Sequence, residues 1–407
     1  MKIRISSNRR VAIGMVAAIF LTMSAVSQAV WEPSRLSDPS RRWSLSAAVS
    51  SGYDDNVLTS RKDDPNKQES ATTSFRPQLF LNIPMDQTFL GLRYGYEAIY
   101  YWDRPGNDEI DQSHTADLSF SHRFNPRLQF DLSDTFRRGI RPELVDIVEN
   151  VPRIYQQEGN YYYNSLTANL AYNISRLWTV IVANTWEMWA VDATDTDDRD
   201  IYSPRITLNY TLNPTTTLGL NLNLGIVDYD LPGEKNARNS TSENISLTLT
   251  HMFNPKLNGQ ITAGGGITEF GDGQTSSSPY ASGNLTYRYA ANGTVSCVAS
   301  YFLYTSSQYG YRSAETLASF VQFHQAITPK LMAILGANYI YSLYDNPYPP
   351  TLPTGLDSQA WRFNIGLSYA FTRWISAECH YSFDTFTSQT GFAYDRNRVW
   401  AGMRFTY

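Results

Sequence analysis

The stretch TLGLNLNLGIVDY, residues 217–229, places a leucine or isoleucine at every second position from 218 to 226. Successive side chains of a β-strand point to opposite faces, so a period of two predicts a strand with one apolar and one polar face. The apolar face carries Leu218, Leu220, Leu222, Leu224 and Ile226, and the polar face carries Gly219, Asn221, Asn223 and Gly225. One face of this strand therefore suits hydrocarbon, and the other suits water.

The same alternation recurs from Trp43 to Tyr407 in segments of about 10 to 16 residues, as in FLGLRYGYEAIYYW at 89–102 and WRFNIGLSYAF at 361–371. Because the same alternation of apolar and polar residues continues throughout this range, the pattern predicts one domain rather than several. Aromatic residues gather toward the segment ends, where amphipathic rings favour the boundary between lipid headgroups and chains. We expect such aromatic girdles to include Trp186, Trp189, Trp361, Tyr369, Phe371 and Tyr381.

The connections between these segments are of two kinds, taken strictly in turn. Tight ones include FNPRL at 124–128, LNPTTTL at 212–218, FNPKL at 253–257 and ITPKL at 327–331, where proline starts a turn. Long polar ones include GIRPELVDIVENVPR at 139–153 and DNPYPPTLPTGLD at 345–357. Eight tight turns and nine long loops predict 18 strands. We therefore expect an all-β fold, a single closed antiparallel transmembrane β-barrel with short periplasmic turns and long extracellular loops.

The amino-terminal segment predicts export. MKIRISSNRR is basic, VAIGMVAAIFL is a short apolar run, and Ser27-Gln28-Ala29 resembles a cleavage site. We interpret residues 1–29 as a signal peptide, residues 30–42 as a short periplasmic lead and residues 43–407 as the barrel. This organisation predicts the outer membrane of a Gram-negative bacterium, with lipid and lipopolysaccharide as surroundings.

The last segment, RVWAGMRFTY, ends in an apolar series with an aromatic final residue. This series resembles the terminal signal by which outer-membrane barrels are recognised, which implies the barrel assembly machinery as a partner. The candidate signal residues are Val399, Ala401, Met403, Phe405 and Tyr407.

Composition and motifs give no support for an enzyme. The formal net charge is −5, which argues against nucleic-acid binding, and two cysteines, Cys297 and Cys379, cannot form a disulfide framework. No serine elbow, histidine pair or other metal-ligand spacing is present, so we expect no catalytic residues, metal or cofactor. The acidic loop DATDTDDRD at 192–200 lacks the glycine and terminal glutamate of a calcium loop and is interpreted as solvated, with weak divalent binding as the alternative.

Charged residues on the polar parity predict the lining of a lumen. If the last two strands pair with residue numbers summing to 782, Glu378 faces Arg404 and Asp384 faces Arg398 in one register. Further charges, including Arg76, Arg93 and Glu97, are expected on opposite parts of the wall. The candidate pore-lining residues are Arg93, Glu97, Arg205, Glu378, His380, Asp384, Arg396, Arg398, Trp400 and Arg404. They either order a polar solute or only satisfy one another's charges.

The stretch SGYDDNV at 51–57 resembles the first strand of a family of outer-membrane barrel proteins associated with exopolysaccharide export clusters. Its specific motif is Tyr53 to Val57. Alternation places Tyr53 and Val57 toward lipid and Asp54 and Asn56 toward the lumen, with Asp55 near the outer headgroups. Since Asp54 and Asp55 then point to opposite faces, they cannot form a paired-carboxylate site.

The resemblance implies an integral pore without catalytic residues. Our first hypothesis is a conduit for an exopolysaccharide or another hydrophilic glycan, working with periplasmic export components, and an inward Trp400 could offer sugars a stacking face. A general or sugar-selective diffusion porin is the alternative. An outer-membrane enzyme or adhesin on a barrel scaffold is the third possibility.

Overall fold

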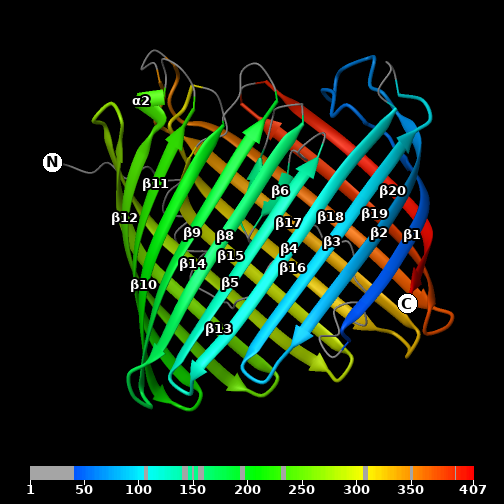
Figure 1. Cartoon of the computed structure of the whole chain (residues 1–407). Coiled ribbons are helices and arrows are strands. Elements are labelled where there is room, and N and C mark those ends of the chain that lie inside the picture. The colour runs from blue at the N-terminus through cyan, green and yellow to red at the C-terminus, as the bar shows by residue number, and fades with distance from the viewer. Residues whose placement is uncertain are drawn as a thin grey trace.

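A computed structural model shows a single closed barrel of 18 antiparallel strands (Figure 1). It describes residues 41–104, 109–139, 145–148, 151–154, 160–192, 198–230, 235–305, 310–348, 352–389 and 391–407. The signal peptide and most of the predicted lead lie outside these residues. No helix among the described residues is long and apolar enough to cross a membrane.

The barrel strands follow one another around the ring in chain order. They are β1 (Trp43–Asp54), β2 (Ser70–Pro84), β3 (Thr88–Tyr101), β4 (Ile110–Asn125), β5 (Leu128–Gly139), β8 (Tyr161–Asn173), β9 (Trp178–Val191), β10 (Arg199–Asn213), β11 (Thr216–Tyr229), β12 (Ser240–Asn254), β13 (Leu257–Phe270), β14 (Thr275–Ala290), β15 (Gly293–Thr305), β16 (Ser313–Ala326), β17 (Leu331–Tyr344), β18 (Leu356–Ala370), β19 (Ile375–Ser388) and β20 (Ala393–Thr406). A small hairpin, β6 (Val145–Val148) with β7 (Val151–Ile154), lies between β5 and β8, and the short helix α2 (Lys235–Arg238) lies between β11 and β12.

The predicted alternation of tight turns and longer connections holds for most of the ring, but β13–β14 and β19–β20 are joined by only four residues each. Two residues separate β10 from β11 and β12 from β13, each pair joined through an Asn-Pro turn, whereas 15 residues separate β1 from β2. In the turn after β12, Asn254 Oδ1 accepts the backbone N–H of Lys256 at 2.9 Å, the local bond by which asparagine favours a turn. The tight turns lie at one end of the barrel and the longer connections at the other (Figure 1).

The barrel closes between its first and last strands. β1 pairs with β20 from Ser46↔Thr406 to Asp54↔Arg398, and with β2 on its other edge. At the short-turn end, Leu45 and Tyr407 exchange backbone hydrogen bonds of 3.1 and 2.8 Å, and the rings of Trp43 and Tyr407 lie 5.2 Å apart. Closure leaves no open sheet edge, as a hydrocarbon environment requires.

The outward face is apolar. Leu247 is 65% exposed and Ile245 is 54% exposed, although both are large hydrophobic residues in the middle of a strand. The outward-facing residues of the predicted assembly signal behave alike, with Phe405 53% and Tyr407 62% exposed. Trp189 is an exception to the predicted girdle: it lies on the inward face of β9, is 4% exposed and packs against Tyr163. Trp186 and Trp189 are three residues apart, so they cannot share a face of one strand.

Candidate functional site

The inner surface carries two contrasting walls. Closure places β1, β2 and β3 beside β20, β19 and β18, and we call the inward face of these six strands the seam wall. Arg76 on β2 and Glu97 on β3 therefore lie next to the charged residues of the last strands. Their expected position on an opposite part of the wall was wrong, because the linear order of the strands hides their closure into a ring.

Arginine–carboxylate pairs line the seam wall. Arg404 donates to both oxygens of Glu378, from Nε at 2.6 Å and Nη2 at 3.2 Å, and its Nη1 donates to Gln78 at 3.1 Å. Asp384 accepts from two arginines, Arg362 and Arg398, the latter at 2.9 Å. Bidentate pairs of this kind are strong where water is excluded. Both predicted pairs, Glu378 with Arg404 and Asp384 with Arg398, are present.

The predicted register of the last two strands was wrong. β19 and β20 pair Ser376↔Arg404 and Asp384↔Arg396, a sum of 780 rather than 782. A slip of two residues keeps every side chain on its face, and arginine is long enough to reach a diagonal neighbour. The predicted ion pairs therefore form diagonally, and Arg396, directly opposite Asp384, bonds to Asp54 of β1 instead.

In the pairs made by Asp384 and Asp54, the guanidinium groups are more exposed than the carboxylates that they bind. The Asp384 side chain is 2% exposed, whereas its partners Arg362 and Arg398 are 11% and 23% exposed. The Asp54 side chain is 5% exposed against 12% for Arg396. At these two carboxylates the seam wall thus exposes its arginines more than its acids, whereas Arg404 with Glu378, 0% and 4% exposed, has the reverse order. Glu97, 30% exposed and 3.6 Å from Arg76, is the carboxylate at the edge of this layer.

Trp400 lies at the centre of the seam wall between two flat groups. The His380 ring, from β19, stacks on it at 5.4 Å, and the Arg76 guanidinium, from β2, lies 4.3 Å from its centroid. Because these neighbours come from strands on opposite sides of β20, they occupy opposite faces of the indole. The expectation that Trp400 offers sugars a free stacking face was therefore wrong. Gly52, directly opposite Trp400, gives the indole room, since a Cβ there would lie 2.7 Å from Trp400 Cβ.

The sequence motif after Gly52 joins the two ends of the barrel sheet. Asp54 binds Arg396, Asp55 accepts from the backbone N–H and the side-chain amide of Asn397 at 2.7 and 2.8 Å, and Asn56 donates to the Asp395 carbonyl at 3.0 Å. Asp54 lies on the inward face of β1, as predicted, and both Asp54 and Asn56 are buried. Val57 is also buried, at 4% exposure, so its expected position toward lipid was wrong. Alternation ended with the strand, which stops at Asp54.

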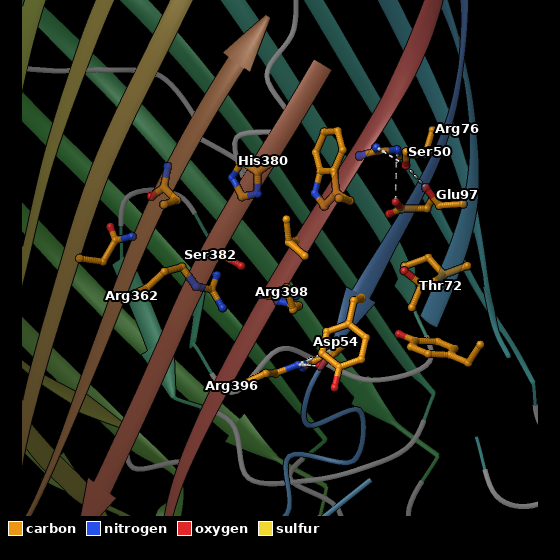
Figure 2. Close-up of a pocket in the computed structure, with 18 of the residues that line it drawn as sticks. Ser50, Asp54, Thr72, Arg76, Glu97, Arg362, His380, Ser382, Arg396 and Arg398 are labelled. Carbon is orange, nitrogen blue, oxygen red and sulfur yellow. Dashed lines mark hydrogen bonds and ion pairs between the residues drawn. The ribbon is translucent and has the colours of Figure 1, made fainter. Parts of the chain in front are cut away.

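A pocket of about 220 Å³ opens on the seam wall and extends to β16 and β17 (Figure 2). Figure 2 shows Arg362 and His380 on one side and Arg76 with Glu97 on the other. We call this cavity the wall pocket. Its polar lining is made of Ser50, Asp54, Thr72, Ser74, Arg76, Glu97, Gln322, Asn338, Arg362, Asn364, His380, Ser382, Arg396 and Arg398. Ile99, Phe320 and Trp400 contribute apolar lining.

The opposite side of the barrel, β11 to β13, has no acidic or basic side chain on its inward face within the described strands. We call it the neutral wall. Hydroxyl and amide groups bond across it: Asn221 donates to Thr248 at 2.9 Å, and the Thr248 and Thr262 hydroxyls lie 2.8 Å apart. Nine strand-to-strand steps separate β11 from β20 in either direction, so the two walls face each other across the lumen.

The other predicted lumen residues lie outside the wall pocket. Arg93 faces inward on β3, 3.8 Å from Asp117 and over the Phe80 ring. Arg205 faces inward on β10, beside the neutral wall, and is exposed. Sequence reasoning did not single out Arg362, Asp54 or Asn338 as site residues, although all three stand on the polar parity. Only closure of the ring and the strand registers identify them.

Histidines and cysteines form no cluster in the described residues. His114, His122 and His251 face outward, as predicted, and each bonds to a hydroxyl of a neighbouring strand: Tyr94, Thr88 and Thr216. Cys297 and Cys379 are free thiols on β15 and β19. Residues 193–197 of the acidic loop lie outside the described residues.

These features define a porin-like β-barrel of the Gram-negative outer membrane. The family described as "Putative beta-barrel porin 2" matches residues 160–407, and the chain belongs to this family. No curated protein matches the sequence.

Comparison with solved structures finds porins at low sequence identity. OccK9 (OpdG) of Pseudomonas aeruginosa is 11% identical with a TM-score of 0.48, and the match covers 90% of this chain and 98% of that one. The BenF-like porin of Pseudomonas fluorescens Pf-5 is 11% identical with a TM-score of 0.47, covering 89% and 98%. OccAB4 of Acinetobacter baumannii is 12% identical with a TM-score of 0.46, covering 90% and 99%.

Proposed function

We propose that this barrel is a diffusion channel for small hydrophilic solutes and that it favours anions. The family description, a porin, supports diffusion over the polysaccharide conduit that we had placed first from the sequence, and no comparison points to export. It also supports a channel over an enzyme or adhesin. The preference for anions is our inference from the seam wall.

The observation that carries the preference is the layering of charge on that wall. Arg362, Arg396 and Arg398 are more exposed than Asp54 and Asp384, the almost fully buried carboxylates that they bind. Arginines exceed carboxylates in this cluster, because Asp384 serves two of them. A positively charged surface inside a low-dielectric barrel raises the local concentration of anions and lowers that of cations.

The test is the reversal potential of the purified protein in planar bilayers under a potassium chloride gradient. We expect the sign that indicates chloride preference. Arg398→Gln should lower the anion-to-cation permeability ratio about twofold, the order expected for one partly exposed unit charge. Asp384 keeps Arg362 as a partner in this variant, so the fold should survive.

Arg127→Gln is a matched control, because it removes the same charge from an exposed tight-turn position outside the lumen. It should leave the ratio nearly unchanged. A cation preference in the unmodified protein, or a barrel that does not conduct at all, would contradict the proposal.

A further inference from the structure

Apart from Arg76 and Glu97, the lining of the wall pocket has two chemically different sides. Arg362, Arg396 and Arg398 provide guanidinium groups on β18 and β20, whereas Gln322, Asn338 and Asn364 provide amides on β16, β17 and β18. Asn338 stands directly opposite Arg362 on the neighbouring strand, so the amide side and the guanidinium side adjoin. A ligand in this pocket meets both kinds of group at once.

Asn338 is the residue that indicates what the amide side binds. It is 4% exposed and lines the pocket, and its Oδ1 has no hydrogen-bond partner among the described residues. A buried acceptor without a partner costs about 1–3 kcal/mol, so native proteins rarely retain one. A donor supplied by a ligand would recover this energy. A carboxylate has no proton to donate at neutral pH, whereas a hydroxyl group has.

The guanidinium side calls for a different group on the same ligand. Planar guanidinium groups match carboxylates in geometry and charge. Arg398 is the most exposed of the arginines that bind Asp384, and it contacts that carboxylate through Nη2. The pocket therefore combines recognition of an anion with recognition of a hydroxyl donor.

The pocket opens to the lumen and has room for a small molecule. Its volume of about 220 Å³ is more than a single water needs, and it lies below the usual range of about 300–1,000 Å³ for ligand pockets. The apolar lining from Ile99 and Phe320 suits the C–H faces of a compact ring.

We propose that the wall pocket binds a small polyhydroxylated carboxylate of the sugar-acid class. The carboxylate lies against Arg398 and Arg362, and a ring hydroxyl donates to Asn338 Oδ1. This assignment rests on the proposed channel function. It names the class of solute that binds in the wall pocket while it crosses the channel.

The test uses three probes of similar size. Glucuronate carries both groups, glucose lacks the carboxylate, and cyclohexanecarboxylate lacks the hydroxyls. Titration calorimetry on the purified barrel in detergent measures binding, and block of single-channel current measures occupancy of the lumen. We expect glucuronate to bind at least about tenfold more tightly than either comparison probe, a ratio worth about 1.4 kcal/mol.

Two variants separate the two sides of the pocket. Asn338→Leu keeps the side-chain size and removes the unpaired acceptor, so it should erase the preference for glucuronate over cyclohexanecarboxylate. Its thermal unfolding temperature should not fall, because an unsatisfied buried polar group has been removed. Arg398→Gln should weaken both carboxylates and leave glucose unchanged.

Each contrary outcome overturns a defined part of the proposal. Equal binding of cyclohexanecarboxylate and glucuronate would overturn the hydroxyl assignment, and equal binding of glucose would overturn the carboxylate assignment. An anion-selective channel that binds none of the probes would overturn the pocket and leave the channel function intact. Binding of glucuronate to a barrel that does not conduct would overturn the channel function instead.

Discussion

The seam wall and the neutral wall hold polar groups inside the same barrel by different means. On the seam wall, Arg404 and Glu378 are 0% and 4% exposed in their side chains and pair with each other. On the neutral wall, Thr248 is half-buried and shares hydroxyl and amide hydrogen bonds with its neighbours. A buried charge tolerates no loss of its partner, whereas a half-buried hydroxyl can turn to water. Removing a hydrogen-bonding partner should therefore cost more stability on the seam wall than on the neutral wall.

The largest effect should follow from breaking the most deeply buried pair. Glu378→Gln leaves the Arg404 guanidinium buried without its carboxylate, and we expect unfolding to become easier by about 3–5 kcal/mol. Urea unfolding of the barrel in lipid vesicles, followed by tryptophan fluorescence, measures the change. The double variant Glu378→Gln with Arg404→Met should recover much of the loss, while Arg205→Gln, an exposed charge beside the neutral wall, should change little. A Glu378→Gln loss below about 1 kcal/mol would show that water replaces the carboxylate.

A smaller effect should follow from crowding the indole of the seam wall. In Gly52→Ala the new Cβ would meet the Val399 carbonyl oxygen at 2.4 Å as well as Trp400, and backbone atoms cannot easily move aside. We expect a loss of about 1–3 kcal/mol in the same unfolding experiment. Gly225→Ala on the neutral wall is the control, because its Cβ would lie 3.7 Å from the nearest atom. Equal losses of unfolding free energy for the two variants would show that the seam wall is not packed more tightly than the neutral wall.

The smallest effect should come from the neutral wall itself. Thr248→Val removes a hydroxyl that accepts from Asn221 and bonds with Thr262, and the loss should be about 0.5–1 kcal/mol, the ordinary net value of a neutral hydrogen bond. The measurement is again the free energy of unfolding, with permeability as a second readout, which should not change. A loss as large as that of Glu378→Gln would mean that the neutral wall is as dry as the seam wall.

Alternation along the sequence predicted the barrel and the inward or outward face of most side chains, because these depend on the period of two. The count of turns and loops predicted the number of strands. Alternation also predicted the ion pairs of Glu378 and Asp384, since a slip of two residues leaves faces unchanged. It could not predict that Arg76 lies over Trp400, because the two residues are 324 positions apart and meet only through closure. It placed Val57 wrongly because no local signal marked the end of β1 at Asp54. The wall pocket could not be predicted from alternation, because its lining depends on the closure of the barrel and on the registers of eight strands.

The pairing of Leu45 with Tyr407 at the short-turn rim has a topological consequence. Both ends of the barrel sequence lie side by side, with their rings 5.2 Å apart, so a short peptide could join them without disturbing any strand. Circular permutation could then open the ring at the tight turn between β10 and β11. The interruption in the covalent chain would move from the charged side of the lumen to the uncharged side. Each strand would keep its neighbours in the barrel. β20, which carries the arginines, would be followed directly by β1 in the covalent chain.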